Sequence, residues 1–352
     1  MLSSCSTGTD KSCRNEIVTP CIPVGEPHKL LTEYNLFRGD LSQLEPVQQL
    51  LPYDLDTPLF SDYAEKYRFL YLPEGKSVVY SDSGTLDFPV GTVLVKNFLY
   101  PGHEQDSGTG RIILETRLLV RYETGWRAET YVWNDEQDEA VLQRTGDTKE
   151  VTWTDIRGIV RRIQYLVPSK NDCKNCHARH RSLVPLGPTA ANLNKTFQYP
   201  DGPENQLSRW EMEGILGSKP DSRLIPRAPV WNDASTGTVS KRARMYLDVN
   251  CAHCHNPVGS ANNSGLYLQF HQDDPFRLGI CKSPVSPGPG SGGFKYNIVP
   301  CEPEKSILVF RIKTVEPEKR MPEIGRTLVH EEAVALIRRW IGEMECRSCE
   351  IK

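Results

Sequence analysis

The chain has 352 residues, of which 38% are hydrophobic and 25% charged, a composition typical of a globular protein with one large domain or two to three ordinary ones. Its formal net charge is only −3 and no basic run occurs, so nothing indicates a nucleic-acid partner. No run of about 18 apolar residues occurs, so no membrane-spanning helix is predicted.

The first 30 residues are polar and contain Pro and Cys, and we predict that residues 1–30 form a tether. Within them, Leu-Ser-Ser-Cys at residues 2–5 is similar to the end of a bacterial lipoprotein signal, in which the Cys becomes the lipidated first residue. This predicts a protein of the periplasm or cell surface whose membrane contact is only a lipid on Cys5. A chance occurrence of these four residues is the alternative.

The next stretch, residues 31–168, has the composition of an antiparallel β-domain. Segments rich in β-branched and aromatic residues alternate with short turns such as Glu-Gly-Lys and Glu-Thr-Gly. Apolar and polar residues alternate in several of them, as in strands with one solvated face, so we predict a sandwich-like domain. The predicted strands cover residues 68–72, 91–100, 111–122 and 126–133.

Helical periodicity replaces the strand pattern after residue 168. Apolar residues recur at helical spacing in residues 204–217, 240–255 and 330–344, and the last of these is strongly amphipathic. We therefore expect an α+β protein in which the β-domain is followed by a mainly α-helical, cytochrome c-like region. Its parts would be a first haem segment, 169–235, and a second domain, 236–352.

Two Cys-x-x-Cys-His motifs carry the chemistry. The first consists of Cys173, Cys176 and His177, and the second of Cys251, Cys254 and His255. In this motif the two thiols add to the two vinyl groups of haem, and the adjacent His becomes the proximal ligand of the iron. The sequence therefore predicts two covalently bound haem c groups.

Zinc is the rival interpretation, since two Cys-x-x-Cys pairs could supply four thiolates. The usual gap between such pairs is about 15–20 residues. Here the motifs begin 251 − 173 = 78 positions apart, and a His follows each pair at once. The spacing therefore favours haem over zinc, and over dithiol chemistry.

A sixth ligand can be predicted for the second haem. Met321 follows His255 by 321 − 255 = 66 residues, precedes Pro322, and is followed by the amphipathic segment. Methionine downstream of the motif is a common distal ligand in cytochromes c, although an ordinary core Met is the alternative. His253, inside the motif, is expected at the surface.

The first haem has no comparable partner. The candidates are Met212, His180, His103 and His28, but each has an ordinary explanation as a core or surface residue. This haem could therefore be five-coordinate with an open face. The predicted function is electron transfer, and the alternative is a haem oxidoreductase acting at the open face on peroxide, hydroxylamine or nitric oxide.

Six further cysteines remain when the haem cysteines and Cys5 are set aside, an even number that fits disulfides in an oxidising compartment. Sequence does not determine their pairing. Neighbours in the chain give the simplest expectation, in which the last pair is a terminal staple rather than a redox-active dithiol. The expected pairs are Cys13–Cys21, Cys281–Cys301 and Cys346–Cys349.

Several stretches resemble an uncharacterised family of exported bacterial proteins with two Cys-x-x-Cys-His motifs. They include "YDLDTPLFSDYAEKYRFLYLPEG", "ETRLLVRYETGW" and "YLDVNCAHCHNP", and the resemblance covers roughly residues 30–345. It implies haem c and export, and the predicted electron transfer requires a redox partner protein. It also hints at a parallel β-helix repeat protein as a partner, because such proteins are often encoded nearby.

The two halves also resemble other proteins. "VPCEPEKSILVFRI", "RMPEIG" and "ALIRRWI" are similar to planctomycete-type cytochrome c domains, with Cys301 in place of the usual Gly. The order of strands followed by a Cys-x-x-Cys-His motif resembles the small β-sheet cytochromes that oxidise hydroxylamine, in which a Lys is cross-linked to haem. That resemblance implies Lys96 as a position to test, and a surface Lys is the alternative.

Overall fold

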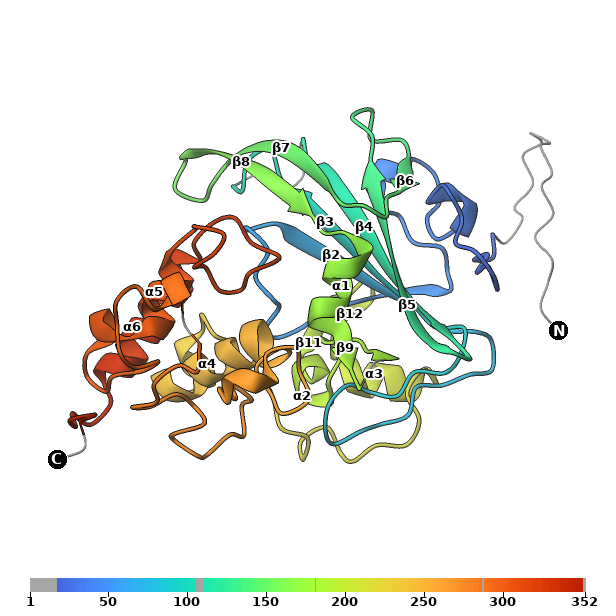
Figure 1. Cartoon of the computed structure of the whole chain (residues 1–352). Helices are drawn as coiled ribbons and strands as arrows, with labels where there is room; N and C mark the ends of the chain where they lie inside the picture. The colour runs from blue at the N-terminus through green and yellow to red at the C-terminus, as the bar shows by residue number, and fades with distance from the viewer. Residues whose placement is uncertain (1–17, 106–109, 181, 287, 351–352) are drawn as a thin grey trace.

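The computed structural model describes residues 18–105, 110–180, 182–286 and 288–350. Its first half is built on one six-stranded antiparallel sheet, in which each strand pairs with the next one along the chain (Figure 1). The strands are β1 (Leu50–Tyr53), β2 (Glu65–Tyr71), β3 (Val93–Tyr100), β4 (Ile112–Tyr122), β5 (Gly125–Trp133) and β6 (Ala140–Leu142). Only β4 and β5 are joined by a tight turn, at Tyr122–Gly125, and longer segments connect the other neighbouring strands.

The sequence-predicted strands are confirmed, because each of the four overlaps one of β2 to β5. The prediction of a sandwich was wrong. The only other long strands in the described chain, β7 (Asp147–Thr154) and β8 (Val160–Val167), form a separate hairpin instead of a second facing sheet. Trp153 and Tyr165 of this hairpin pack with Phe98 and Tyr100 of the sheet. The pattern within one strand could not reveal this, because apolar and polar residues alternate in the same way in a hairpin and in a sandwich strand.

The prediction of a mainly α-helical cytochrome c-like region was also wrong. The protein is dominated by its antiparallel sheet, and about 22% of it is helical. After β8 the helices are short and long irregular segments join them. They are α1 (Lys170–His177), α2 (Ala190–Leu193), α3 (Gln206–Met212), α4 (Val239–Leu247), α5 (Ile307–Lys313) and α6 (Glu331–Gly342), with two-stranded pairs β9–β10 (Ala178–Arg179, Ser182–Leu183) and β11–β12 (Thr196–Tyr199, Gly202–Asn205).

Local sequence explains why the predicted helices are shorter than expected. The segment predicted as 204–217 gives only α3, because Glu204 and Asn205 belong to β12 and the chain turns through Gly214 at a φ of 73°. The amphipathic segment gives α6, as predicted. α4 is capped by Thr238, whose side chain accepts a hydrogen bond from Lys241 N.

Separate hydrophobic clusters lie on the two faces of the sheet and around the C-terminal helices. One face of the sheet is covered by residues 31–47. A second cluster joins Tyr53, Leu70 and Leu94 to residues 190–225, so the segment predicted as 169–235 shares its core with the sheet. Residues 239–341 have a core of their own around α4, α5 and α6. Of the predicted tether, the described part contacts the sheet: Tyr122 donates a hydrogen bond to Pro23 O at 2.9 Å.

Two of the expected disulfides were wrong. Cys281 is bonded to Cys349 and Cys301 to Cys346, so both cysteines of the C-terminal tail join the preceding loops. The tail is brought there by α6, where Cys301 N donates to Ile341 O at 2.9 Å. Sequence proximity failed because the helix returns the chain to an earlier segment. Cys21 is disulfide-bonded, and its expected partner Cys13 lies outside the described residues.

Candidate functional site

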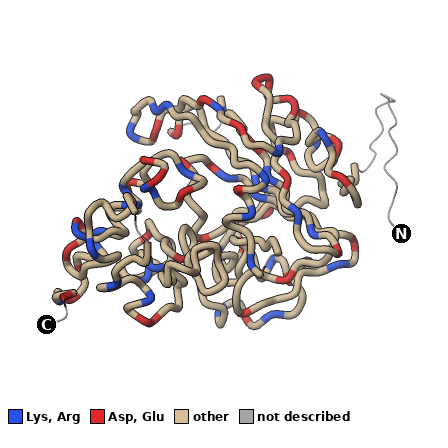
Figure 2. The backbone as a smooth tube through the Cα atoms, in the orientation of Figure 1, with Lys and Arg blue, Asp and Glu red and all other residues tan. Residues whose placement is uncertain are grey.

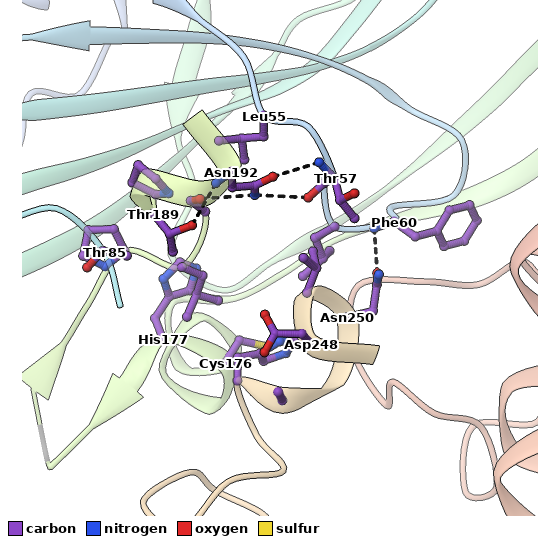
Figure 3. A pocket seen from close by; sticks show the side chains of 18 of the residues that line it. Leu55, Thr57, Phe60, Thr85, Cys176, His177, Thr189, Asn192, Asp248 and Asn250 are labelled. Atoms are coloured by element: carbon purple, nitrogen blue, oxygen red, sulfur yellow. Dashed lines mark hydrogen bonds between the residues drawn. The ribbon is translucent and has the colours of Figure 1, made fainter. Parts of the chain in front are cut away.

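A cavity of about 570 Å³ lies between the sheet and the C-terminal half, and residues of both motifs line it (Figure 3). This volume is in the range of ordinary cofactor and ligand pockets. Three residues of the first motif line it, together with one cysteine of the second motif and the predicted methionine ligand. These are Cys173, Cys176, His177, Cys251 and Met321.

The first motif lies on α1, directly after the β7–β8 hairpin. Ser169 and Asp172 form a capping box that fixes the start of this helix. Cys173 and Cys176 are three residues apart on it, so their side chains lie on one face and both reach the cavity.

His177 is held by a single residue. Its Nδ1 donates to Val184 O at 2.8 Å, and its own carbonyl accepts from Val184 N at 2.9 Å. Because a carbonyl can only accept, Nδ1 carries the proton and Nε2 keeps its lone pair. Burial lowers the pKa of His177 to about 4, so the imidazole is neutral at pH 7. A neutral imidazole oriented by a backbone carbonyl has the form of a metal-ligating His.

The second motif begins where α4 changes into the π-helical turn η4 (Asp248–Ala252). Such turns are rare and frequent at functional sites. Cys251 on this turn is buried and lines the cavity. His255 Nδ1 lies 3.3 Å from Ser264 Oγ, whose own proton goes to Ala261 O, so the imidazole donates there. Neither Cys254 nor His255 lines the cavity. Only one cysteine of the second motif therefore faces it, whereas both cysteines and the His of the first motif do.

The two motifs lie against each other. Ligand atoms of Cys176, His253 and Cys254 all lie within 4.8 Å of one another. Asn175 O, in the first motif, accepts from Ser260 Oγ at 3.0 Å and from Cys254 Sγ at 3.4 Å. The hydrogen bond between the two thiols lowers the pKa of Cys254 and raises that of Cys176. This contact joins cysteines 254 − 176 = 78 positions apart, and the prediction of two separate haem sites did not include it.

His253 was expected at the surface, and that expectation was wrong. Its exposed fraction is 6%, it lines the cavity, and its Nδ1 has no hydrogen-bond partner in the described part of the chain. A buried imidazole nitrogen without a partner is costly and indicates a missing ligand or neighbour.

Met321 lies on the cavity wall, and its role as an iron ligand stays a prediction. Sequence reasoning missed two other residues there, Met245 and His330. His330 stacks on Phe60 with ring centroids 4.1 Å apart, and its Nδ1 lies 3.1 Å from Tyr246 Oη. Its position just before the amphipathic helix, nine residues after Met321, was a signal that could have been noticed.

None of the sixth-ligand candidates proposed for the first haem lines the cavity. Met212 is 67% exposed on α3, and the candidates His180, His103 and His28 lie outside the lining as well. The wall nearest the first motif is instead formed by the sheet, including Lys96 and Arg117. Burial and the neighbouring cations lower the pKa of Lys96 well below its usual value.

The loop between β1 and β2 joins both motif regions over the cavity. Thr57 N donates to Asn192 Oδ1 and Phe60 N to Asn250 Oδ1, each at 2.8 Å (Figure 3). Asp62 in the same loop accepts from Thr327 N and Leu328 N, close to Met321 in the chain. One short loop therefore positions α2, the π-helical turn and the Met321 segment relative to one another.

The residues at the first motif fit a covalently attached haem, since two thiols on one helical face and an oriented neutral imidazole share a cavity of suitable size. No protein-family model, curated protein or solved structure matches this chain. Among the described residues, no helix has the length and apolar character needed to cross a bilayer.

Proposed function

We propose that this protein is an exported di-haem c-type cytochrome that transfers electrons to a redox partner protein. The hydrogen bond from His177 Nδ1 to Val184 O carries the proposal, because it orients Nε2 as a ligand beside two cavity-lining cysteines. Bound haem would supply one-electron chemistry at iron. Export, with a lipid on Cys5 and a parallel β-helix repeat protein as a possible partner, belongs to the proposal and rests on the sequence.

The residues of the chain have distinct tasks in this proposal. Cys173, Cys176, Cys251 and Cys254 attach the two haems, and His177 and His255 hold the irons. Met321 is the proposed second axial ligand at the second site. The contact of Asn175 with Cys254 and Ser260 keeps the two attachment segments together, which supports electron exchange between the two sites.

Mass spectrometry of protein matured with a cytochrome c assembly system tests the proposal. The expected mass includes two haems, and a pyridine haemochrome assay should give two haems per chain. The control is Cys173→Ser/Cys176→Ser/Cys251→Ser/Cys254→Ser, which should carry none. Matured wild-type protein without haem would refute the proposal.

A thiolate metal site is the second candidate, favoured by the cluster of Cys176, His253 and Cys254. Two thiolates and an imidazole are suitable ligands for zinc, with a fourth position left for another group. Metal analysis distinguishes the two: this candidate requires about one zinc per chain and no haem, and His253→Ala should remove the zinc. Haem attachment at Cys176 and Cys254 would exclude it, because the same sulfurs cannot serve both.

An open-faced oxidoreductase site at the first haem is the alternative activity. It is favoured by the cavity wall beside the first motif, where none of the Met and His candidates from the sequence is found. Rapid binding of cyanide or carbon monoxide by half of the haem, with turnover of peroxide, hydroxylamine or nitric oxide above that of free haem, would support it. Two low-spin haems without rapid ligand binding would leave electron transfer alone.

A further inference from the structure

Three cations stand directly opposite one another on neighbouring strands. Arg68 of β2 pairs with Lys96 of β3, and Lys96 pairs in turn with Arg117 of β4. Their Cα atoms are in register, so the three side chains leave the sheet on the same face. Figure 2 shows charged residues of both signs interspersed along the chain, so this row is a local feature. Like charges directly opposite destabilise a sheet unless something neutralises them.

Two of the three cations are neutralised within the protein. Arg68 Nη1 lies 2.8 Å from Asp54 Oδ1, and Arg117 Nε donates to Glu115 Oε2 at 2.8 Å. Lys96 has no ion pair and no hydrogen bond among the described residues. Its ammonium lies 4.6 Å from the centroid of the Phe98 ring. Its side chain lines the cavity beside the first motif.

Four carboxylates of described residues line the same cavity and all are engaged elsewhere, the exposed Asp82 with Tyr80. Glu129 accepts from Lys170 Nζ at 3.1 Å, Asp172 caps α1, and Asp248 accepts from Phe270 N at 2.9 Å. A second cation of the lining is also incompletely paired, because Arg179 Nε is buried without a hydrogen-bond partner. Lys96 and Arg179 Nε therefore lack a carboxylate partner among the described residues of this cavity.

We propose that Lys96, beside Arg117, binds an anionic oxygen group that enters this cavity. Two sources share this chemistry: a carboxylate of the bound haem, or a small inorganic oxyanion such as nitrite. In both cases the negative charge offsets the burial and the neighbouring cations that disfavour the ammonium form of Lys96, so a charge-assisted hydrogen bond can form. The inference deepens the proposed function, on which its haem readouts rest, but the anion site itself depends only on side chains of this chain.

The test compares Lys96→Met with Lys66→Met in matured protein. Lys66 is a matched control, because it lies on β2, has no ion pair with any described residue, and is not part of the cavity lining. Nitrite is titrated while the haem spectrum and the melting temperature are followed. Lys96→Met should weaken nitrite binding about tenfold or more, the effect of removing a hydrogen bond to a charged group, and Lys66→Met less than about twofold.

A second measurement distinguishes the two sources. If Lys96→Met leaves nitrite binding unchanged but shifts the pH dependence of one haem midpoint potential, the haem carboxylate is the partner of Lys96. If Lys96→Met changes neither property more than Lys66→Met does, the proposal is overturned. Haem content reports the proposed function separately, and protein without haem still shows by its melting temperature whether nitrite binds through Lys96.

Discussion

The same pentapeptide occurs in two different settings in this protein. The first motif ends a short helix, α1, and faces a cavity wall formed by the sheet. Residues 190–225, which follow this motif, share a hydrophobic core with the sheet. The second starts in a π-helical turn and belongs to a separate core, closed by α6 and two disulfides. Met245, Met321 and His330 line the cavity on the second side, whereas Lys96 and Arg117 line it near the first. On the proposed function, the same motif would attach haem at both sites, and the different surroundings would give the two sites different roles.

Removing one attachment site at a time tests this comparison most directly. Cys173→Ser/Cys176→Ser and Cys251→Ser/Cys254→Ser should each lower the haem content from two to one, measured by mass spectrometry. If the wild-type protein binds cyanide rapidly, as the open-faced alternative requires, only the first double variant should abolish that binding, because the open wall lies at the first motif. If both double variants lost rapid cyanide binding equally, the assignment of different roles to the two sites would be contradicted.

Core substitutions should separate the two regions. Trp340→Ala empties the core around α6, and Trp210→Ala empties the core shared with the sheet. Each should lower the free energy of unfolding by about 3–5 kcal/mol in urea titrations. The haem spectrum should be perturbed at the second site by Trp340→Ala and at the first by Trp210→Ala. If both variants perturb the same site, the two cores do not act separately.

Acid should weaken the second region through His330. Burial lowers the pKa of His330 to about 4 from an ordinary 6.5. The folded state therefore favours the neutral ring, and the stability it contributes above pH 6.5 is lost as the pH falls to about 4. The loss should be about 3 kcal/mol. His330→Gln should flatten the pH dependence of unfolding in this window, and the exposed His271→Gln should not. A steep dependence in His330→Gln would assign the loss to other groups.

The axial ligand gives the smallest expected effect. Met321→Ala should lower one midpoint potential by on the order of 100 mV and leave the other nearly unchanged, because a thioether favours the ferrous state. It should also remove the weak ferric absorption band that reports iron–sulfur ligation. Met245→Ala is the matched control. If Met245→Ala or His330→Gln produces the shift and Met321→Ala does not, the ligand lies on a different part of the wall.

The sequence predicted the local features that short-range chemistry determines. β3 and β4 could be predicted because they are rich in β-branched and aromatic residues. α6 could be predicted because its apolar residues share one face. The motif cysteines could be recognised as a candidate site because the Cys-x-x-Cys-His spacing is chemically specific. What failed depends on how distant segments meet: the Cys281–Cys349 pairing, the hairpin on the sheet, and the contact of Cys176 with Cys254. The cytochrome c-like fold failed because motif order does not determine helix length in segments rich in Gly and Pro.

The contact between the two motifs also constrains the order in which the protein is made. In the folded chain Cys176 Sγ and Cys254 Sγ lie within 4.8 Å of each other, and a disulfide requires them to approach to about 2 Å. In an oxidising compartment, a chain that folded before receiving haem would join one cysteine of each motif, which would block both attachment sites at once. On the proposed function, haem therefore has to be attached while the chain is still unfolded. Peptide mapping of exported protein from cells lacking the attachment machinery should find this cross-link between residues 176 and 254.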